Sequence, residues 1–264
     1  MSDPDADIDA GALVDLAVGL ARQAGTLLLE LHATRPQHVA TKSTLTDMVT
    51  EMDRASERLI VEGLLAARPD DGILGEEGSA RDGVSGVRWI VDPLDGTTNY
   101  LYGHFAWAVS IAAEVEGSVV AGVVVDASHD EVFTARLGGG ATRNGEPIAV
   151  SGHDELATAL VGTGFSYAAD ARARQAVLLE RVLPNVRDIR RNGSAALDLC
   201  WVACGRLDAH YEQGLAPWDL AAGELIAREA GARTSDFTGG PARPGEVLAA
   251  TPGIADALLA LLVT

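Results

Sequence analysis

The order of apolar segments constrains the fold of this chain more than any other feature. Four segments rich in β-branched and aromatic residues follow one another with short connections: Val87–Val91, Trp107–Ala113, Val119–Val125 and Glu131–Ala135. Strands spaced this closely pair into a largely antiparallel sheet. Apolar residues at helical spacing predict two preceding helices, Gly11–Leu31 and Asp47–Ala67, packed against that sheet.

After residue 150 the pattern changes, because predicted strands now alternate with predicted helices. The strands are Ala159–Gly164, Asp188–Arg190, Ala209–Tyr211 and Val247–Ala250, and the helices are Ala171–Leu183, Ser194–Cys204, Leu220–Ala230 and Ile254–Leu262. Alternation of this kind predicts helices that cover the faces of a sheet. We therefore expect an α+β sub-domain over residues 1–150 and an α/β sub-domain over residues 151–264, stacked as layers of helix and sheet.

Charge and composition narrow the possible partners. Asp and Glu number 38 against 20 Lys and Arg, a net charge of −18 that repels phosphate backbones, so we expect no nucleic-acid partner. We also expect no membrane span, no secretory signal and, with only Cys200 and Cys204, no disulfide framework, which together indicate a cytoplasmic protein. An anionic ligand would need local positive charge, and carboxylate clusters recruit divalent cations.

The most informative segment begins where the first predicted strand ends, at Asp92-Pro-Leu-Asp95. A turn there can direct the carboxylates of Asp92 and Asp95, and the carbonyl of Leu94 between them, at one Mg²⁺ or Ca²⁺ ion. The following Gly96 and Thr97 offer close backbone approach and free N–H groups to a phosphate. A simple Asp-Gly turn between two strands is the alternative interpretation.

Three other segments place acids at the ends of predicted elements, and each also has a purely structural explanation. Glu76 with Glu77 fits a solvated turn, Thr50 followed by Asp53 fits a helix capping box, and Asp219 fits a helix N-cap. The six histidines are dispersed and suggest no nucleophile–base pair. The more specific hypothesis is that acids from these separate segments converge on one cation site.

Together these motifs resemble the inositol monophosphatase family over nearly the whole chain. The resemblance rests on Asp47-x-x-Thr50-x-x-Asp53, Gly75-Glu76-Glu77, Asp92-Pro-Leu-Asp-Gly-Thr97, Gly193-Ser-Ala-Ala196, Tyr211-Glu212 and Trp218-Asp-Leu-Ala-Ala-Gly223. It implies a layered αβαβα sandwich with a metal site between the halves. It also implies a homodimer and inhibition by lithium.

The resemblance further implies a role for each matching residue. Mg²⁺ ions would be held by Glu76, Asp92, the Leu94 carbonyl, Asp95 and Asp219. Glu76 and Thr97 would orient the attacking water, with Asp53 accepting a hydrogen bond from the Thr97 hydroxyl. The substrate would contact Glu76, Leu94, Asp95, Gly96, Thr97, Gly193, Ser194, Ala195, Glu212 and Asp219.

Substrate choice is implied by Glu212, which in the family accepts hydrogen bonds from inositol hydroxyls. The predicted activity is therefore Mg²⁺-dependent hydrolysis of inositol-1-phosphate. Hydrolysis of histidinol phosphate or another small phosphomonoester is the alternative within the same class, because relatives use much the same metal residues. An alternative of another class is a regulatory protein-binding module, since some bacterial relatives join the transcription machinery. The basic pair Arg190-Arg191 fits either a phosphate contact or an interface ion pair.

Overall fold

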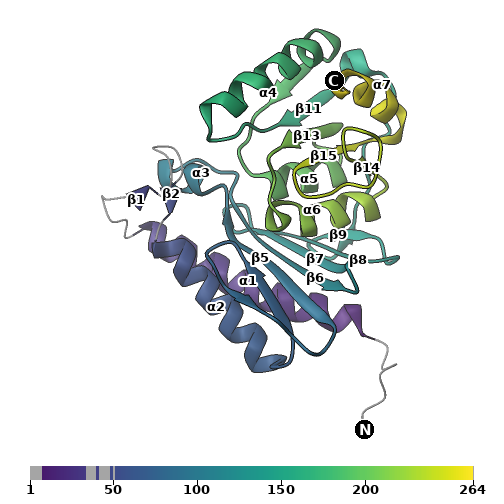
Figure 1. The fold of residues 1–264 in the computed structure, drawn as a ribbon. Coiled ribbons are helices and arrows are strands. Elements are labelled where there is room, and N and C mark those ends of the chain that lie inside the picture. The colour runs from purple at the N-terminus through teal and green to yellow at the C-terminus, as the bar shows by residue number, and fades with distance from the viewer. Residues whose placement is uncertain (1–7, 34–39, 42–47, 50, 264) are drawn as a thin grey trace.

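The computed structural model describes residues 8–33, 40–41, 48–49 and 51–263. Two motif residues, Asp47 and Thr50, lie outside this described part. Figure 1 shows the fold. The helices are α1 Ala10–Ala33, α2 Glu51–Ala67, α3 Thr97–Tyr102, α4 Ala169–Val182, α5 Ala195–Ala203, α6 Pro217–Glu229 and α7 Pro252–Leu262, with 3₁₀ turns at Leu156–Thr158 and Leu183–Asn185.

A large sheet is formed by residues 72–147, with the strand order β10-β9-β8-β7-β6-β5-β3-β4. Its strands are β3 Gly72–Gly75, β4 Ala80–Arg81, β5 Val87–Asp95, β6 Ala108–Val115, β7 Ser118–Asp126, β8 Glu131–Arg136, β9 Ala141–Arg143 and β10 Glu146–Pro147. Neighbours are antiparallel except for β3 and β5. Asn144 and Gly145 join β9 to β10 with φ of 51° and 83°, the positive angles that a tight hairpin turn requires. A separate short pair joins β1 Ala40–Thr41 to β2 Met48–Val49.

A smaller sheet follows, with the order β12-β11-β13-β15-β14. Its strands are β11 Leu160–Thr163, β12 Asp188–Arg190, β13 Ala209–Gln213, β14 Arg233–Ser235 and β15 Glu246–Ala250. Strand β11 runs parallel to both β12 and β13, so the carboxyl ends of three strands meet at one edge. Strand β15 is antiparallel to β13 and β14.

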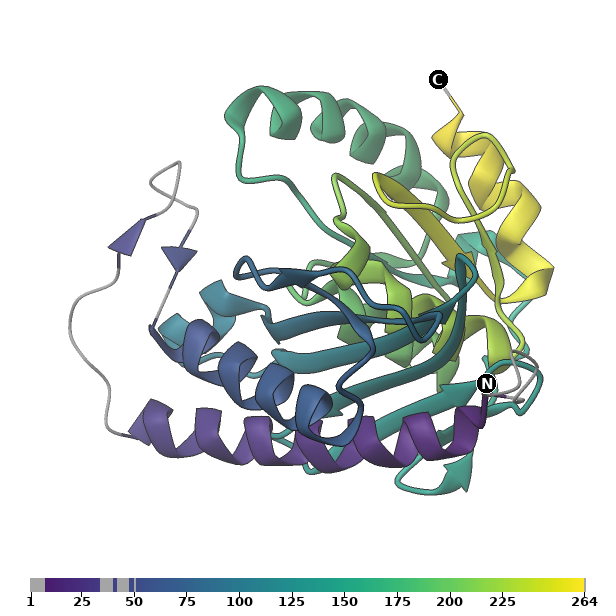
Figure 2. The ribbon, with the colours of Figure 1, turned by 60° about the horizontal axis from the view of Figure 1, so that its bottom comes forward.

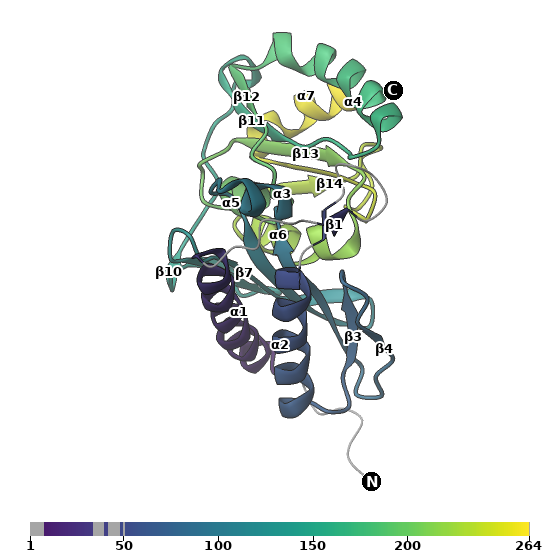
Figure 3. The same ribbon diagram turned by 90° about the vertical axis from the view of Figure 1, so that its left-hand side faces the viewer.

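The elements stack in five layers, as Figure 3 shows from the side. Helices α1 and α2 cover the outer face of the large sheet, α5 and α6 lie between the two sheets, and α4 and α7 cover the outer face of the smaller sheet. Along β5 the layers follow the alternation of a strand: Trp89 and Val91 are buried with α1 and α2, and Ile90 is buried with α5 and α6. This arrangement confirms the predicted αβαβα sandwich.

Helix α1 is long and apolar enough to cross a membrane by length and composition alone. Length and composition alone therefore do not support the expectation of no membrane span for this helix. One face of α1, which includes Leu13, Ala17, Leu20 and Leu28, is buried in the core beneath the large sheet. Figure 2 shows α1 and α2 lying side by side along that sheet, as expected of core helices in a folded domain.

Helix α6 lies directly on the large sheet at Gly122 of β7. A Cβ atom built on Gly122 would lie 2.9 Å from the carbonyl oxygen of Ala222 in α6, closer than a real side chain can approach backbone. Ala222 is fully buried at this contact. The absence of a side chain at Gly122 therefore sets how closely α6 approaches the sheet.

Candidate active site

The two aspartates of the central motif lie at the end of β5, where pairing with β6 is irregular between Asp92 and Asp95. In a regular strand, residues three apart would point to opposite faces. Ile90 and Leu94 are four residues apart, so in a regular strand they would lie on the same face. Instead Ile90 is buried with α6 and Leu94 is buried with α1 and α2, which shows that the strand changes face between them. The bulge therefore brings both carboxylates to the α6 side. Asp92 Oδ1 also accepts a hydrogen bond from the backbone N–H of Leu94 at 3.0 Å.

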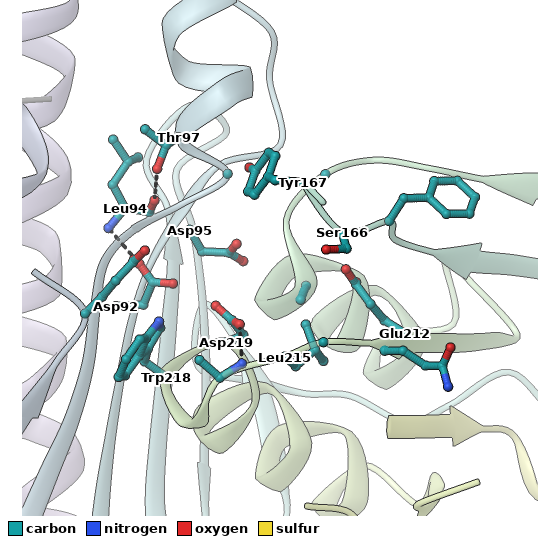
Figure 4. Close-up of a pocket in the computed structure, with 18 of the residues that line it drawn as sticks. Asp92, Leu94, Asp95, Thr97, Ser166, Tyr167, Glu212, Leu215, Trp218 and Asp219 are labelled. Atoms are coloured by element: carbon teal, nitrogen blue, oxygen red, sulfur yellow. Dashed lines mark hydrogen bonds between the residues drawn. The ribbon is translucent and has the colours of Figure 1, made fainter. Parts of the chain in front are cut away.

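A third carboxylate reaches the same point from α6. Ligand oxygens of Asp92, Asp95 and Asp219 all lie within 4.8 Å of one another. Figure 4 shows Asp219 directed toward the two aspartates of β5. Asp219 is not the N-cap that the sequence suggested, because α6 begins two residues earlier, at Pro217 after the N-cap Ala216. From the third helical position its Oδ2 accepts a hydrogen bond from the Ala216 N–H at 2.7 Å.

Electrostatics at this cluster favour a bound cation. Burial raises the pKa of Asp92 well above its usual value, and the charges of Glu76, Asp95 and Asp219 raise it further. Burial raises the pKa of Asp95 to about 6, although hydrogen bonds from Ser194 and Ala196 oppose the shift. The pKa of Asp219 is likewise raised, first by burial and then by Asp95. Buried carboxylates this close must bind protons or a cation, and a set of hard oxygens suits a divalent cation.

Glu76, Thr97 and Asp53 are the residues to which the resemblance assigns the attacking water. Glu76 hydrogen-bonds to the side chain of Asp92 and lines the same cavity. The Thr97 hydroxyl lies 3.1 Å from the Leu94 carbonyl oxygen and 3.4 Å from Oδ1 of Asp53. Asp53 is 3% exposed and stands behind Thr97, outside the cavity lining. A hydroxyl has one proton, so Thr97 donates to one of these two oxygens at a time.

A cavity of about 440 Å³ opens in front of these groups. Predicted site residues in its lining are Glu76, Asp92, Leu94, Asp95, Gly96, Thr97, Gly193, Ala195, Glu212 and Asp219. Ser194 is fully buried behind the wall and donates a 2.5 Å hydrogen bond to Oδ2 of Asp95. The structure thus brings together residues from β5, α5, β13 and α6, of which Asp92 and Asp219 are 127 positions apart in the chain.

Glu212 faces the acidic cluster from the opposite side of the cavity (Figure 4). Its side chain is 16% exposed and lies over Gly164, where any Cβ atom would overlap the carboxylate. A glycine immediately after β11 is therefore what leaves room for Glu212. The carboxylate can accept hydrogen bonds from a hydroxyl-bearing ligand in the cavity.

Part of the wall was missed by sequence reasoning. The segment Phe165–Ala168 follows β11, and its Tyr167 hydroxyl lies 3.3 Å from Thr98 Oγ1. Burial raises the pKa of Tyr167. Of the undecided basic pair, Arg191 lines the cavity, whereas Arg190 pairs with Asp188 at 2.6 Å. The available signal was topological, because ligands gather at the carboxyl ends of parallel strands and both segments follow such strands.

Known proteins resemble this chain in sequence and in fold. Residues 10–264 match the Inositol monophosphatase family. The chain is 51% identical to Inositol-1-monophosphatase SuhB of Mycobacterium tuberculosis over 85% of its own length and 81% of that protein. It is 39% identical to Nus factor SuhB of Pasteurella multocida, covering 94% of each. The crystal structure of extragenic suppressor protein SuhB from Bartonella henselae superposes with a TM-score of 0.91 at 39% identity, covering 95% of this chain and 98% of that one.

Proposed function

Because the chain belongs to the inositol monophosphatase family, we propose that it hydrolyses inositol-1-phosphate to inositol and phosphate with Mg²⁺ as its cofactor. Phosphatase activity follows from the family itself, and the proposal adds the metal and the substrate. The observation that carries the proposal is the position of Glu212 across the cavity from Asp92, Asp95 and Asp219. One wall therefore suits a cation and a phosphate, and the other suits hydroxyl groups.

The residues that would hold Mg²⁺ are Glu76, Asp92, Asp95, Asp219 and the carbonyl of Leu94. All supply oxygen atoms, which this ion prefers. Bound there, Mg²⁺ would supply positive charge for the phosphate oxygens and lower the pKa of the attacking water. The raised pKa values of Asp92, Asp95 and Asp219 support this assignment, because each is raised by burial and by the charge of neighbouring carboxylates, which a bound cation would offset.

Thr97 would direct the attacking water through its hydroxyl oxygen, with its proton donated to Asp53. When the Leu94 carbonyl is engaged as a ligand, the Thr97 proton has Asp53 Oδ1 as its remaining acceptor, 3.4 Å away. The Thr97 oxygen would then accept a hydrogen bond from the attacking water, which Glu76 would also orient. Glu212 would accept hydrogen bonds from the hydroxyls of the leaving alcohol.

The test is phosphate release, with and without Mg²⁺, from inositol-1-phosphate, histidinol phosphate, fructose 1,6-bisphosphate and adenosine 3′,5′-bisphosphate. The proposal requires inositol-1-phosphate to be preferred, and Glu212→Ala to reduce that preference while the variant remains folded. Preference for histidinol phosphate would leave the metal chemistry intact and overturn the choice of substrate. Activity without any divalent cation would overturn the cofactor.

A second function, binding to a protein partner, is supported by the relatives named Nus factor. The two functions are separable because only one needs the acidic cluster. If the chain also acts as a binding module, Asp92→Asn should lose phosphate release and keep its partner in co-purification. Loss of both together would tie the partner to the active site.

Two further properties, a homodimer and inhibition by lithium, are proposed on the strength of the family resemblance alone. A cytoplasmic location is proposed from the sequence-based expectation of no membrane span, no secretory signal and no disulfide framework. Light scattering after size-exclusion chromatography tests the dimer, and phosphate release against increasing LiCl, with KCl as the ionic-strength control, tests the inhibition. Fractionation of cells tests the location.

A further inference from the structure

His210 lies behind the substrate cavity between two carboxylates. It is fully buried on β13, with Nδ1 3.6 Å from Oδ2 of Asp198 and Nε2 3.4 Å from Oε2 of Glu212. Within the described part of the chain, neither ring nitrogen makes a hydrogen bond of normal geometry. A buried imidazole held at ion-pair distance from two acids, one of which lines the cavity, needs an explanation beyond packing.

The neighbouring strand is built to accommodate this ring and the carboxylate beside it. His210 and Glu212 are two residues apart, so they project from the same face of β13. On β11, Gly162 pairs with His210, and a Cβ atom there would lie 3.0 Å from Nδ1. Gly164 leaves the corresponding space for Glu212. On the other side of β13, the paired residue of β15 is the small Ala249.

The charged groups that act most strongly on the ring are acidic. They are Asp198 from α5, Glu212 from β13 itself and Asp95 from β5. Burial lowers the pKa of His210, but its contact with Glu212 and the charges of Asp198 and Asp95 outweigh burial and leave the pKa above its usual value. The acidic surroundings thus favour the cationic form of the ring.

Asp198 contacts the Nδ1 side of the ring, opposite Glu212. Its Oδ1 accepts a 2.6 Å hydrogen bond from Nδ2 of Asn192, which directs its Oδ2 toward His210. Burial raises the pKa of Asp198 to about 7, and His210 and Asn192 oppose that rise. The contacts therefore form a series in the order Asn192, Asp198, His210 and Glu212.

We propose that the His210 imidazolium positions Glu212 for the hydroxyl groups of the substrate, which makes His210 a specificity-determining residue for the leaving alcohol. The inference rests on the proposed function. The cation compensates the charge of Glu212 against Asp95 and Asp219, and it holds Oε2 so that Oε1 faces the cavity. When His210 loses a proton, the neutral ring has a single N–H for two carboxylates, and its other nitrogen carries a lone pair. The position of Glu212 is then no longer fixed by the ring.

The experiment compares two substrates at saturating Mg²⁺ between pH 6 and 9. Inositol-1-phosphate presents hydroxyls to Glu212, and 4-nitrophenyl phosphate presents none. For His210→Phe, kcat/KM for inositol-1-phosphate relative to 4-nitrophenyl phosphate should fall about 10-fold, mainly through KM, as expected for loss of one charge-assisted contact. In the wild type this ratio should fall as pH rises through the His210 titration, and in His210→Phe it should be flat.

Two variants separate positioning from packing. His210→Gln keeps a hydrogen-bond donor but not the charge, so it should lose the pH dependence and recover only part of the ratio. His129→Phe removes a histidine that pairs with buried Asp126 at 2.8 Å outside the cavity lining, and it should leave the ratio unchanged. A ratio within twofold of wild type in His210→Phe, or equal losses on both substrates, would overturn the proposal.

A measurement independent of activity uses the ¹⁵N resonances of the histidine rings. The His210 titration, followed by NMR in the wild-type protein, should have its midpoint above those of exposed histidines, and Glu212→Gln should lower it. A ring that stays neutral at pH 6, or a midpoint that Glu212→Gln does not move, contradicts the inference. If 4-nitrophenyl phosphate is hydrolysed but inositol-1-phosphate is not, the proposed substrate fails while this titration still decides the role of His210.

Discussion

Ser194 donates its hydroxyl proton to Oδ2 of Asp95 across 2.5 Å, although the two residues are 99 positions apart in the chain. The backbone N–H of Ala196 reaches the same oxygen at 2.8 Å. Ser194 is also the N-cap of α5, where its oxygen accepts from the N–H of Leu197 at 3.2 Å. One hydroxyl therefore begins the helix and orients a carboxylate of the acidic cluster.

Replacing the Ser194 hydroxyl should weaken both the capping of α5 and the orientation of Asp95. Ser194→Ala removes the cap and one hydrogen bond to Asp95, and each change costs of the order of 1–2 kcal/mol. We expect a lower free energy of unfolding in urea and a cation affinity reduced about 10-fold by calorimetry, as for outer contacts of a metal site. Ser151→Ala is the matched control, because Ser151 donates to Asp208 outside the cavity. Cation affinity unchanged in Ser194→Ala would contradict the assignment.

Asp92→Asn should abolish turnover with little change in fold. Asp92 is 1% exposed within the acidic cluster, and an amide of the same shape replaces its charge. We expect kcat/KM to fall by more than about 100-fold, at or beyond the range seen when outer contacts of a metal site are removed. Circular dichroism checks the fold. Asp126→Asn, at a buried aspartate outside the cavity lining, serves as the comparison. Turnover that survives in Asp92→Asn would remove Asp92 from the cation site.

Cation affinity should rise with pH because the ligands must lose protons. In the metal-free fold, burial raises the pKa of Asp95 from 3.8 to about 6. A raised carboxyl pKa means that the fold prefers the protonated form, so the stability this group contributes is complete below pH 4 and is lost as pH rises through about 6. The shift corresponds to about 3 kcal/mol at about 1.4 kcal/mol per pKa unit.

Thermal unfolding in EDTA tests this linkage by comparing the wild type with Asp95→Asn between pH 4.5 and 7.5. The variant cannot take up this proton. The melting temperature of the variant minus that of the wild type should therefore increase as pH rises. In parallel, Mg²⁺ should stabilise the wild type more at pH 7 than at pH 5. Parallel pH profiles for the two proteins would refute the linkage.

Gly164→Ala should damage substrate recognition and spare the acidic cluster. A methyl group at this position overlaps the carboxylate of Glu212, which must then move from the cavity wall. We expect KM for inositol-1-phosphate to rise about 10-fold, the equivalent of about 1.4 kcal/mol, with a much smaller change for 4-nitrophenyl phosphate. Gly152→Ala is the control, since a methyl group there meets no atom within 4 Å. An equal loss on both substrates would place the damage elsewhere.

Local patterns predicted the framework well because most strands and helices have unambiguous periodicity. The strand at Val87 and the helix at Ile254 needed no tertiary information, and the order of layers followed from alternation. The gathering of Asp92, Asp95 and Asp219 was predicted as a convergence of separate acidic segments. The short helix α3 was missed, since its six residues carry no helical period and its Tyr100 is held by tertiary burial.

Other features depend on register, which a single sequence does not reveal. The bulge that turns Asp95 to the side of Asp92 depends on pairing with β6. The contact between His210 and Asp198 arises because α5 packs over β13, and a histidine in a strand pattern carries no sign of it. The metal identity, the leaving group and the role of each site residue remain predictions that the experiments above address.

A substitution at Gly122 can disturb the acidic cluster although Gly122 lies outside it. Because α6 approaches β7 at a spacing that excludes even a methyl group, any side chain at Gly122 must lift the helix from the sheet. Asp219 belongs to the first turn of that helix and would move with it, whereas Asp92 and Asp95 would remain on the sheet. A mutational scan scored only by activity would therefore group Gly122 with Asp92, Asp95 and Asp219. A scan scored by protein abundance would separate Gly122 from these three aspartates.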